Sequence, residues 1–471
     1  MKTLKFTLPV LAAAVLSACS MAPVYQRPDA PIATVYPAES GPAAGQIAYV
    51  TADAGWREFF QDARLRALIE TALANNRDLR TAALRIEEAR AQYNVVAADT
   101  LPNVAGTASG TRGRTAAATS PTGASVVGSN YQVGLSLAAF ELDFFGRVRS
   151  LNEAALSQYL ATEEAQRAAH ISLVAEVAKA YLSERALGEQ EELARRTLAS
   201  RESALKLAQQ RFEVGASSAL DLKQNEVLAQ TARVTLATLK RQRGQAQNAL
   251  TLLAGRPVNA LPQGLPLSSQ GIVADLPAGL PSDLLGRRPD IRASEQRLKA
   301  SNANIGAARA AFFPRISLTA GVGTASGELS GLFDGGTRTW SFVPQLVLPI
   351  FDAGRNRANL SIAEVRKNIA VADYEKTIQV AFREVADALV ARDAIDEQID
   401  AQARVLDAQR ERLKLAEQRY QGGIASSLDV LDAQRELFSA EQSLVQAQLL
   451  RLTNAVDLYR SLGGGLKETA G

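Results

Sequence analysis

The chain of 471 residues carries one long segment twice, and this duplication constrains its fold more than any other feature. Residues 205–212, LKLAQQRF, recur 208 positions later as residues 413–420, LKLAEQRY. Further matches, at offsets of 208 and 212, pair Gly146 with Gly354 and Pro102 with Pro314. The four-residue difference falls most simply in a turn between two strands. Similar composition alone would not produce matches at a nearly constant offset over so many residues, so the sequence predicts two copies of one unit.

Each copy begins with a helix and two strands. We predict helices at residues 78–99 and 289–312, because a proline follows each and proline stops helices. After Pro314, apolar side chains at positions 316, 318, 320 and 322 alternate with small or polar ones, which is typical of a strand with one apolar face. Second strands are predicted at residues 131–142 and 340–350. Their alternation is less regular, so their membrane-facing side stays unassigned.

A long helical hairpin follows in each copy. Residues 147–212 and 355–420 lack proline, and a helix of this length extends roughly 100 Å. Large apolar side chains recur every seven residues, a period that turns one seam of a coiled coil toward its partner. They stand at positions 198, 205 and 212, and at 399, 406, 413 and 420. A short glycine-containing turn then reverses the chain, and a returning helix runs to Ala254 or Leu462.

The N-terminus resembles a secretory lipoprotein signal. Lys2 and Lys5 precede a short apolar run, and LSAC at 16–19 places Cys19, the only cysteine, where such signals are cut and acylated. Ser20 follows, rather than the aspartate that retains lipoproteins in the inner membrane. The alternative is an ordinary signal peptide that happens to contain a cysteine.

These observations predict the following organisation. A signal peptide (1–18) precedes a proline-rich, lipid-anchored extended segment (19–60). The first copy spans 61–254, with strands at about 102–142 and long helices at about 147–254. A linker (255–281) leads to the second copy, 282–462, with strands at about 314–350 and long helices at about 355–462, and a tail (463–471) ends the chain.

Several functions are excluded by what the sequence lacks. The formal charge of +3 comes without a basic block, which argues against nucleic acid. His170 is the only histidine, and no phosphate loop or nucleophile motif occurs, so we expect no enzyme, no metal and no cofactor beyond the lipid on Cys19.

No apolar segment after the signal is long enough for a membrane helix, so a membrane crossing would require strands. Four strands cannot close a barrel, whereas three chains would supply about 12.

Several motifs together resemble the outer membrane factor family, the TolC-like exit ducts, and most closely its lipoprotein branch that serves RND multidrug efflux pumps. The resemblance covers essentially the whole chain. Its motifs are LSACS at 16–20, PVYQRP at 23–28, FELDFFGR at 140–147, GRRPDI at 286–291, and RYQGG with LDVLDAQR within 419–435. It implies a mainly α-helical fold with a β-barrel portion, in which a trimer forms a barrel of about 12 strands on a helical periplasmic tunnel.

The resemblance also implies a function. The chain would be a passive homotrimeric channel, lipid-anchored in the outer membrane, that opens at its periplasmic tip to export drugs and small toxic molecules. Its partners would be a periplasmic adaptor, an inner-membrane RND transporter and outer-membrane lipid. A type I secretion duct is the alternative within the family. A periplasmic coiled-coil adaptor or scaffold lipoprotein is the alternative outside it, although an adaptor would carry one hairpin and a scaffold would not need amphipathic strands.

The turns of the two hairpins are where the resemblance places adaptor docking. The residues that match are Arg211, Phe212 and Gly215 in the first copy, and Arg419, Tyr420 and Gly423 in the second. The simpler interpretation is a pair of ordinary helix ends at which glycine supplies a left-handed C-cap. Both interpretations can hold together.

The resemblance places a periplasmic gate at Leu428, Asp429 and Asp432. The two aspartates are three residues apart on one helical face, so a trimer could gather six carboxylates into a cation-favouring ring. The alternative is that they serve the helix N-terminus, with Ser426 or Ser427 as the cap. Only the second copy has the pair, because Gln224 matches Asp432. Ala425 stands where some relatives carry a basic latch residue.

Overall fold

The computed structural model describes residues 21–36, 55–121, 123–258, 261–272 and 281–467. Cys19 and the predicted signal peptide lie outside the described residues. The chain forms two compact units, and each unit takes segments from both copies. Unit 1 comprises the chain up to Asp29 with Arg85–Glu163 and Ala293–Glu375, and unit 2 comprises Ala30–Leu84, Glu164–Arg292 and Lys376 onward.

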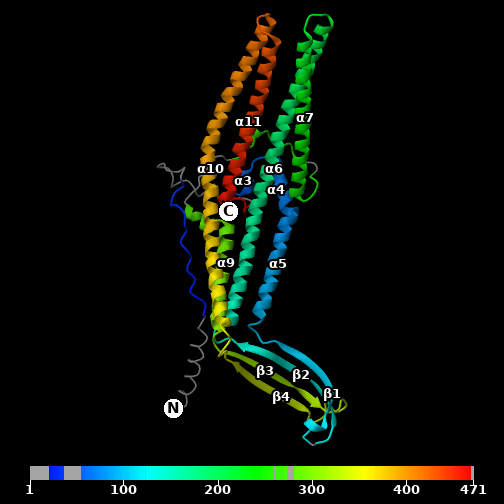
Figure 1. The fold of residues 1–471 in the computed structure, drawn as a ribbon, viewed down its shortest axis with the longest axis vertical. Coiled ribbons are helices and arrows are strands. Elements are labelled where there is room, and N and C mark those ends of the chain that lie inside the picture. Colours follow the sequence, from blue (N-terminus) through cyan, green and yellow to red (C-terminus); the bar gives the residue numbers. More distant parts are fainter. Residues whose placement is uncertain (1–20, 37–54, 122, 259–260, 273–280, 468–471) are drawn as a thin grey trace. The chain divides into compact units, whose positions relative to one another are not determined.

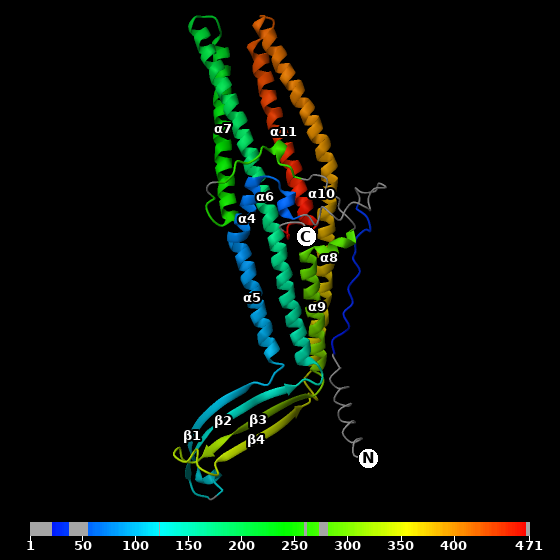
Figure 2. The ribbon, with the colours of Figure 1, turned by 180° about the vertical axis from the view of Figure 1, so that it is seen from behind.

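The strands of both copies form one antiparallel sheet in unit 1, in the order β1-β2-β3-β4 (Figure 2). Their bounds are β1 Val104–Thr115, β2 Val126–Leu142, β3 Arg315–Ser326 and β4 Arg338–Val347. β2 pairs with β3, so the central ladder joins the two copies. The turns between β1 and β2 and between β3 and β4 lie at one end of the sheet. The helices join the strands at the other end.

The pairing register extends the apolar face predicted for β3 across the sheet, including β2 and β4, whose faces sequence alternation left unassigned. Row by row, Leu137 lies opposite Ala320, and Val322 lies opposite both Leu135 and Trp340. This apolar face comprises Val104, Ala108, Tyr131, Val133, Leu135, Leu137, Phe140, Leu318, Ala320, Val322, Trp340 and Phe342. The opposite face carries mainly glycine, serine, threonine and glutamine, so the sheet is amphipathic.

A bulge in β2 explains the irregular alternation of that strand. Pairing with β3 shifts between Leu137 and Phe140, and Ala139 within the bulge has φ 46°. A bulge inserts one residue, so the side chains beyond it change parity relative to those before it. Odd-numbered residues of β2 therefore point to the apolar face before the bulge, and Phe140 and Leu142 point to it afterwards.

Gly134 of β2 and Gly323 of β3 are paired on the polar face, where each leaves no room for a Cβ. A Cβ at Gly134 would lie 2.4 Å from the carbonyl oxygen of Val322. We expect Gly134→Val to force the central ladder apart and to lower the yield of folded, protease-resistant protein in the outer membrane about tenfold. Gly113→Val is the matched control, because nothing lies within 4 Å of its Cβ. Equal yields of the two variants would contradict the prediction.

Each helix end that the sequence predicts lies within two residues of the observed one. In the first copy the helices are α5 Arg77–Ala98, α6 Arg147–Glu213 and α7 Ala219–Ala254. In the second copy they are α9 Pro289–Ala310, α10 Arg355–Gln421 and α11 Ser427–Ser461. Short helices α3 Trp56–Phe59, α4 Ala63–Asn75 and α8 Leu284–Arg287 complete the set. No described helix is both long and apolar enough to cross a membrane.

Two helical hairpins, α6 with α7 and α10 with α11, lie side by side in unit 2 with their turns at the same end (Figures 1 and 2). Ala194, Leu236 and Leu239 form a buried cluster within the first hairpin. Phe438 of α11 packs against this cluster, as does Leu198 of the predicted seam. Apolar packing therefore joins the two hairpins as well as the helices of each.

Residues 21–29, which form neither helix nor strand, are held against α9 in unit 1. Arg27 donates to both carboxylate oxygens of Glu295, at 3.0 and 2.8 Å. Tyr25 donates to the same carboxylate, and Asn302 donates to the carbonyl of Pro23 at 2.7 Å. The PVYQRP motif thus fixes the segment to the second copy.

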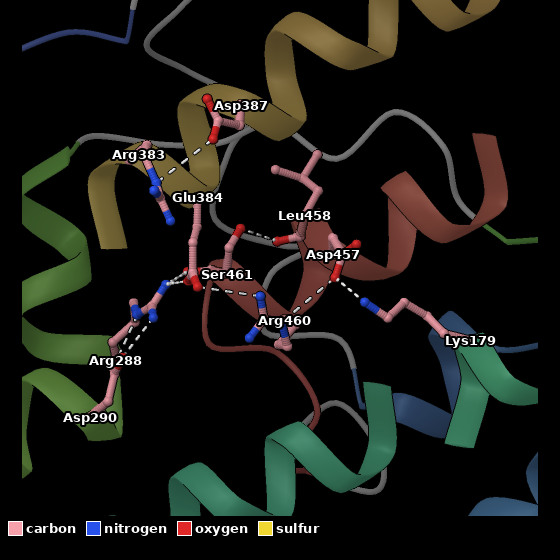
Figure 3. Close-up of polar contacts among 10 residues, drawn as sticks. All are labelled: Lys179, Arg288, Asp290, Arg383, Glu384, Asp387, Asp457, Leu458, Arg460 and Ser461. Carbon is pink, nitrogen blue, oxygen red and sulfur yellow. Dashed lines mark hydrogen bonds and ion pairs between the residues drawn. The ribbon is translucent and has the colours of Figure 1, made fainter. Parts of the chain in front are cut away.

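A buried arginine organises the junction between α8, α9, α10 and α11 in unit 2 (Figure 3). Arg288 donates to Asp290 at 2.6 Å, to Glu384 at 2.7 Å and to the carbonyl of Ser461 at 3.1 Å. Arg460 adds a longer contact to Glu384 at 3.4 Å. Burial opposes the charge of Arg288, but its carboxylate partners hold its pKa above the ordinary arginine value.

At the corresponding junction of the first copy, an asparagine replaces the arginine, so a neutral hydrogen bond replaces the ion pairs. Asn76 matches Arg288 at the offset of 212, and Leu253 matches Ser461 at the offset of 208. Asn76 donates to the carbonyl of Leu253 at 2.9 Å, so both copies secure the end of the returning helix through one side-chain hydrogen bond. Glu176, which matches Glu384, is exposed. The GRRPD motif therefore marks a structural centre of the second copy.

Candidate functional site

Both hairpin turns use glycine as a left-handed cap. Gly215 and Gly423 have φ values of 75° and 70°. Gly215 donates to the carbonyl of Phe212 at 2.9 Å, and Gly423 donates to that of Tyr420 at 3.0 Å. The simpler interpretation of these glycines thus holds. No heavy atom lies within 4 Å of a Cβ at either position, so the turns are also open to contact.

Side chains of the two turns bridge the first and second hairpins. Arg211 donates to the hydroxyl of Tyr420 at 2.6 Å, and its guanidinium lies 5.9 Å from the centre of that ring. Ser427 donates to Asp221 at 3.4 Å. Two of the predicted docking residues, Arg211 and Tyr420, therefore also connect one tip to the other.

The remaining docking residues and two additional apolar side chains are exposed. Phe212 is 43% exposed, and Arg419 is exposed as well. Val214 and Ile424, one in each turn, are 78% and 74% exposed. These two apolar residues were not among the predicted docking residues, although each stands beside a turn glycine.

Asp429, the third residue of α11, takes part in capping the start of that helix. The backbone N–H and the hydroxyl of Ser426 both donate to Asp429 Oδ2, at 3.0 and 3.1 Å. This is a capping box, and Ser218 with Asp221 forms the same arrangement in the first copy. The capping interpretation therefore accounts for Asp429.

Asp432 is placed differently, because two arginines hold it. Arg412 of α10 and Arg435 of α11 each lie 2.5 Å from one of its carboxylate oxygens. The aspartate thus links the outgoing and returning helices of the second hairpin, twenty residues apart in sequence. The predicted ring of carboxylates would therefore carry positive charge as well, because each Asp432 is paired with two arginines.

The cluster around Asp432 is confined to the second copy. At the offset of 208, Ala204, Gln224 and Val227 occupy the positions of Arg412, Asp432 and Arg435. The difference at Gln224 was apparent from the sequence, whereas the differences at the two arginines were not predicted. Extending the comparison of the copies by a few positions would have found them.

Leu428 and Asp432 line a groove between α7 and α11, with a volume of about 390 Å³. Leu428 is 56% exposed. The other lining residues are Leu220, Lys223, Gln224, Val227, Leu228, Leu431 and Arg435. Among the described residues, no group of three histidine, cysteine or carboxylate side chains is placed to hold a metal ion.

Known proteins match this chain over almost its whole length. OprJ, an outer membrane protein of Pseudomonas aeruginosa, is 51% identical over 98% of this chain and 95% of its own. The toluene efflux pump outer membrane protein TtgC of Pseudomonas putida is 48% identical over 97% of this chain and 95% of its own.

Solved structures match the fold equally well. The open state of the MtrE outer membrane channel of Neisseria gonorrhoeae aligns with a TM-score of 0.87, at 44% identity, over 96% of this chain and 100% of that one. A membrane protein from Pseudomonas aeruginosa also aligns with a TM-score of 0.87, at 49% identity, over 94% and 100% of the two chains. The sequence profile of the outer membrane efflux protein family matches residues 68–256 and 280–464, one match for each copy. The chain therefore belongs to the outer membrane efflux protein family, which is a family of channels and not of enzymes.

Proposed function

We propose that this chain is the outer-membrane exit duct of a tripartite RND-type efflux pump. The observation that carries the proposal is the amphipathic four-stranded sheet, attached through continuous helices to two hairpins in a member of this family. An apolar sheet face suits lipid, and a polar face suits a water-filled lumen. The duct is passive, and the transporter supplies the energy.

The sheet supports a trimer. Within the described chain, β1 and β4 are edge strands, and unpaired edges are too costly to leave in lipid. Three chains, joined β4 to β1, would close a barrel of about 12 strands. The helices of the three chains would then form the periplasmic tunnel, and an acylated Cys19 would anchor each chain in the outer membrane.

The hairpin turns supply the docking surface for the periplasmic adaptor. Phe212, Arg419 and the glycine turns present mixed apolar and basic surface, and Val214 and Ile424 enlarge its apolar part. Relatives are named for the efflux of toluene or antibiotics. Small toxic molecules, exported from an RND transporter through the adaptor, are therefore the proposed cargo.

The periplasmic gate in this proposal is the cluster of Arg412, Asp432 and Arg435 beside Leu428. Asp432 holds α10 against α11, and Leu428 offers an apolar constriction next to it. Asp429 contributes charge while it caps α11. Opening then requires the second hairpin to release or rearrange the pairs that Asp432 makes.

Reconstitution tests the proposed function directly. The purified full-length protein is expected to behave as a trimer by mass photometry and to give discrete conductance steps in planar lipid bilayers. A deletion strain should become susceptible to toxic small molecules while its protein secretion is unchanged. A folded protein without conductance would overturn the duct. Lost protein secretion with unchanged susceptibility would favour a type I secretion duct instead.

A further inference from the structure

Three arginines project from the apolar face of the sheet near the end that carries the turns, two from the edge strand β1 and one from the opposite edge strand β4. Arg112 and Arg114 have the same parity as Ala108 along the unbroken β1 ladder, and Ala108 lies opposite Val133. Val133 in turn lies opposite Thr324, and Thr324 lies opposite Arg338. All three arginines therefore project from the face that carries the large apolar side chains. We call them the arginine rim.

The rim lacks an internal counter-charge. In the part of the chain that the structure describes, none of the three guanidinium groups makes an ion pair, and all three side chains are exposed. The one polar contact is from Arg114 to the hydroxyl of Ser125, at 3.2 Å. Glu328 and Asp334 lie in the β3–β4 turn but do not pair with the rim. The three positive charges of the rim are therefore not neutralised by carboxylates of the described chain.

Aromatic residues place the rim at a membrane interface rather than within the hydrocarbon. Trp340 is the next residue after Arg338 on the same face, and it is 80% exposed. Tyr131 packs over Gly110, the residue before Arg112 on that face. Aromatic girdles mark the interfaces of outer-membrane barrels, and arginine is costly at the midplane of the bilayer but well tolerated near its surface.

The turns, not the helices, are at the rim's end of the sheet, so in the proposed duct the rim faces the outer leaflet. We propose that Arg112 and Arg114 at one edge of this face, and Arg338 at the other, bind phosphate groups of the glycolipids of that leaflet. The guanidinium fork matches phosphate oxygens in pairs, and several arginines on one face can engage the phosphates of one or of neighbouring lipids. The site lies on the barrel exterior, away from the conduction path. It rests on the proposed outer-membrane function.

Native mass spectrometry of the full-length trimer tests this site. The probes are purified bisphosphorylated lipid A, the same lipid with both phosphates removed, and phosphatidylglycerol. The wild-type protein is expected to retain the bisphosphorylated lipid in preference to the other two. The triple variant R112Q/R114Q/R338Q should weaken its retention about tenfold or more, because it removes three charges from the surface.

A matched variant controls for net charge. R85Q/R357Q/R366Q also removes three exposed arginines that make no ion pair within the described part of the chain, but from α5 and α10. It should retain the glycolipid as the wild type does, and R112K/R114K/R338K should retain most of it. If the triple glutamine variant does not fold, R338Q alone should still show a smaller loss.

Three outcomes would overturn the site: undiminished retention by the folded glutamine variants, equal retention of the dephosphorylated lipid, or equal retention of phosphatidylglycerol. Conductance of the same preparations separates this failure from that of the duct. If the protein conducts but does not prefer the phosphorylated glycolipid, the proposed function stands and the proposed glycolipid site is wrong.

Discussion

Asp432→Ala is expected to raise the open probability of the reconstituted channel about fivefold and to weaken its block by multivalent cations. The aspartate joins α10 to α11 through Arg412 and Arg435, and its loss removes both links at once. The side chains are partly exposed, so screening leaves about 1 kcal/mol for the pair of contacts. A difference of this size changes a two-state population about fivefold.

Loss of the negative charge of Asp432 should also change the ion selectivity of the channel. Removal of Asp432 leaves two arginines uncompensated, so selectivity should move toward anions as conductance rises. Single-channel recording in asymmetric salt measures both quantities. The effect should shrink at high ionic strength, because salt screens exposed pairs.

The duplication supplies the control. Gln224→Ala changes the matching position of the first copy, which has no arginines at the corresponding places. It should leave conductance and selectivity as in the wild type. Arg412→Ala with Arg435→Ala should open the tip while shifting selectivity toward cations. If Asp432→Ala and Gln224→Ala behave alike, Asp432 does not belong to the gate.

Asp429→Ala separates capping from gating. Loss of the capping box should cost about 1 kcal/mol of local helix stability, with a smaller change in selectivity than Asp432→Ala gives. The double variant Asp429→Ala/Asp432→Ala combines both effects. It should have the highest conductance and the weakest block by multivalent cations of the series.

Local patterns predicted the long helices and the strand pairs of this fold, but not the 13-residue helix α4. Proline after each short helix and its absence from the long ones fixed the helix ends to within two residues, because backbone geometry decides them locally. Repetition at a fixed offset then showed that the second copy must repeat the first. These signals depend on neighbours in sequence, which is why a single sequence contains them.

The missed features depend on contacts between distant residues. The membrane-facing side of β2 could not be assigned because the bulge at Ala139 changes parity within the strand. The roles of Asp432 and Arg288 were hidden because their partners lie on other helices. Differences between the copies nevertheless mark both sites, since Gln224 and Asn76 stand at the matching positions.

Arg288 gives the largest expected loss of stability. Arg288→Ala removes the bonds to Asp290, Glu384 and the carbonyl of Ser461, and leaves a part-buried carboxylate with less compensation. Breaking such a pair costs about 3–5 kcal/mol, and the remaining contact of Arg460 with Glu384 favours the lower end. Asn76→Ala, which deletes only the matching bond in the first copy, should cost about 1 kcal/mol.

A double-mutant cycle identifies the source of this difference. If the loss arises mainly from the uncompensated charge of Glu384, then Glu384→Ala should recover about 1–3 kcal/mol in the Arg288→Ala background. Guanidinium unfolding of the detergent-solubilised protein, followed by circular dichroism, measures each step. In the first copy Glu176 is exposed, so Glu176→Ala should recover nothing when combined with Asn76→Ala. Strict additivity in the second copy would mean that Arg288 acts through its bond to Ser461 alone, as Asn76 acts through Leu253.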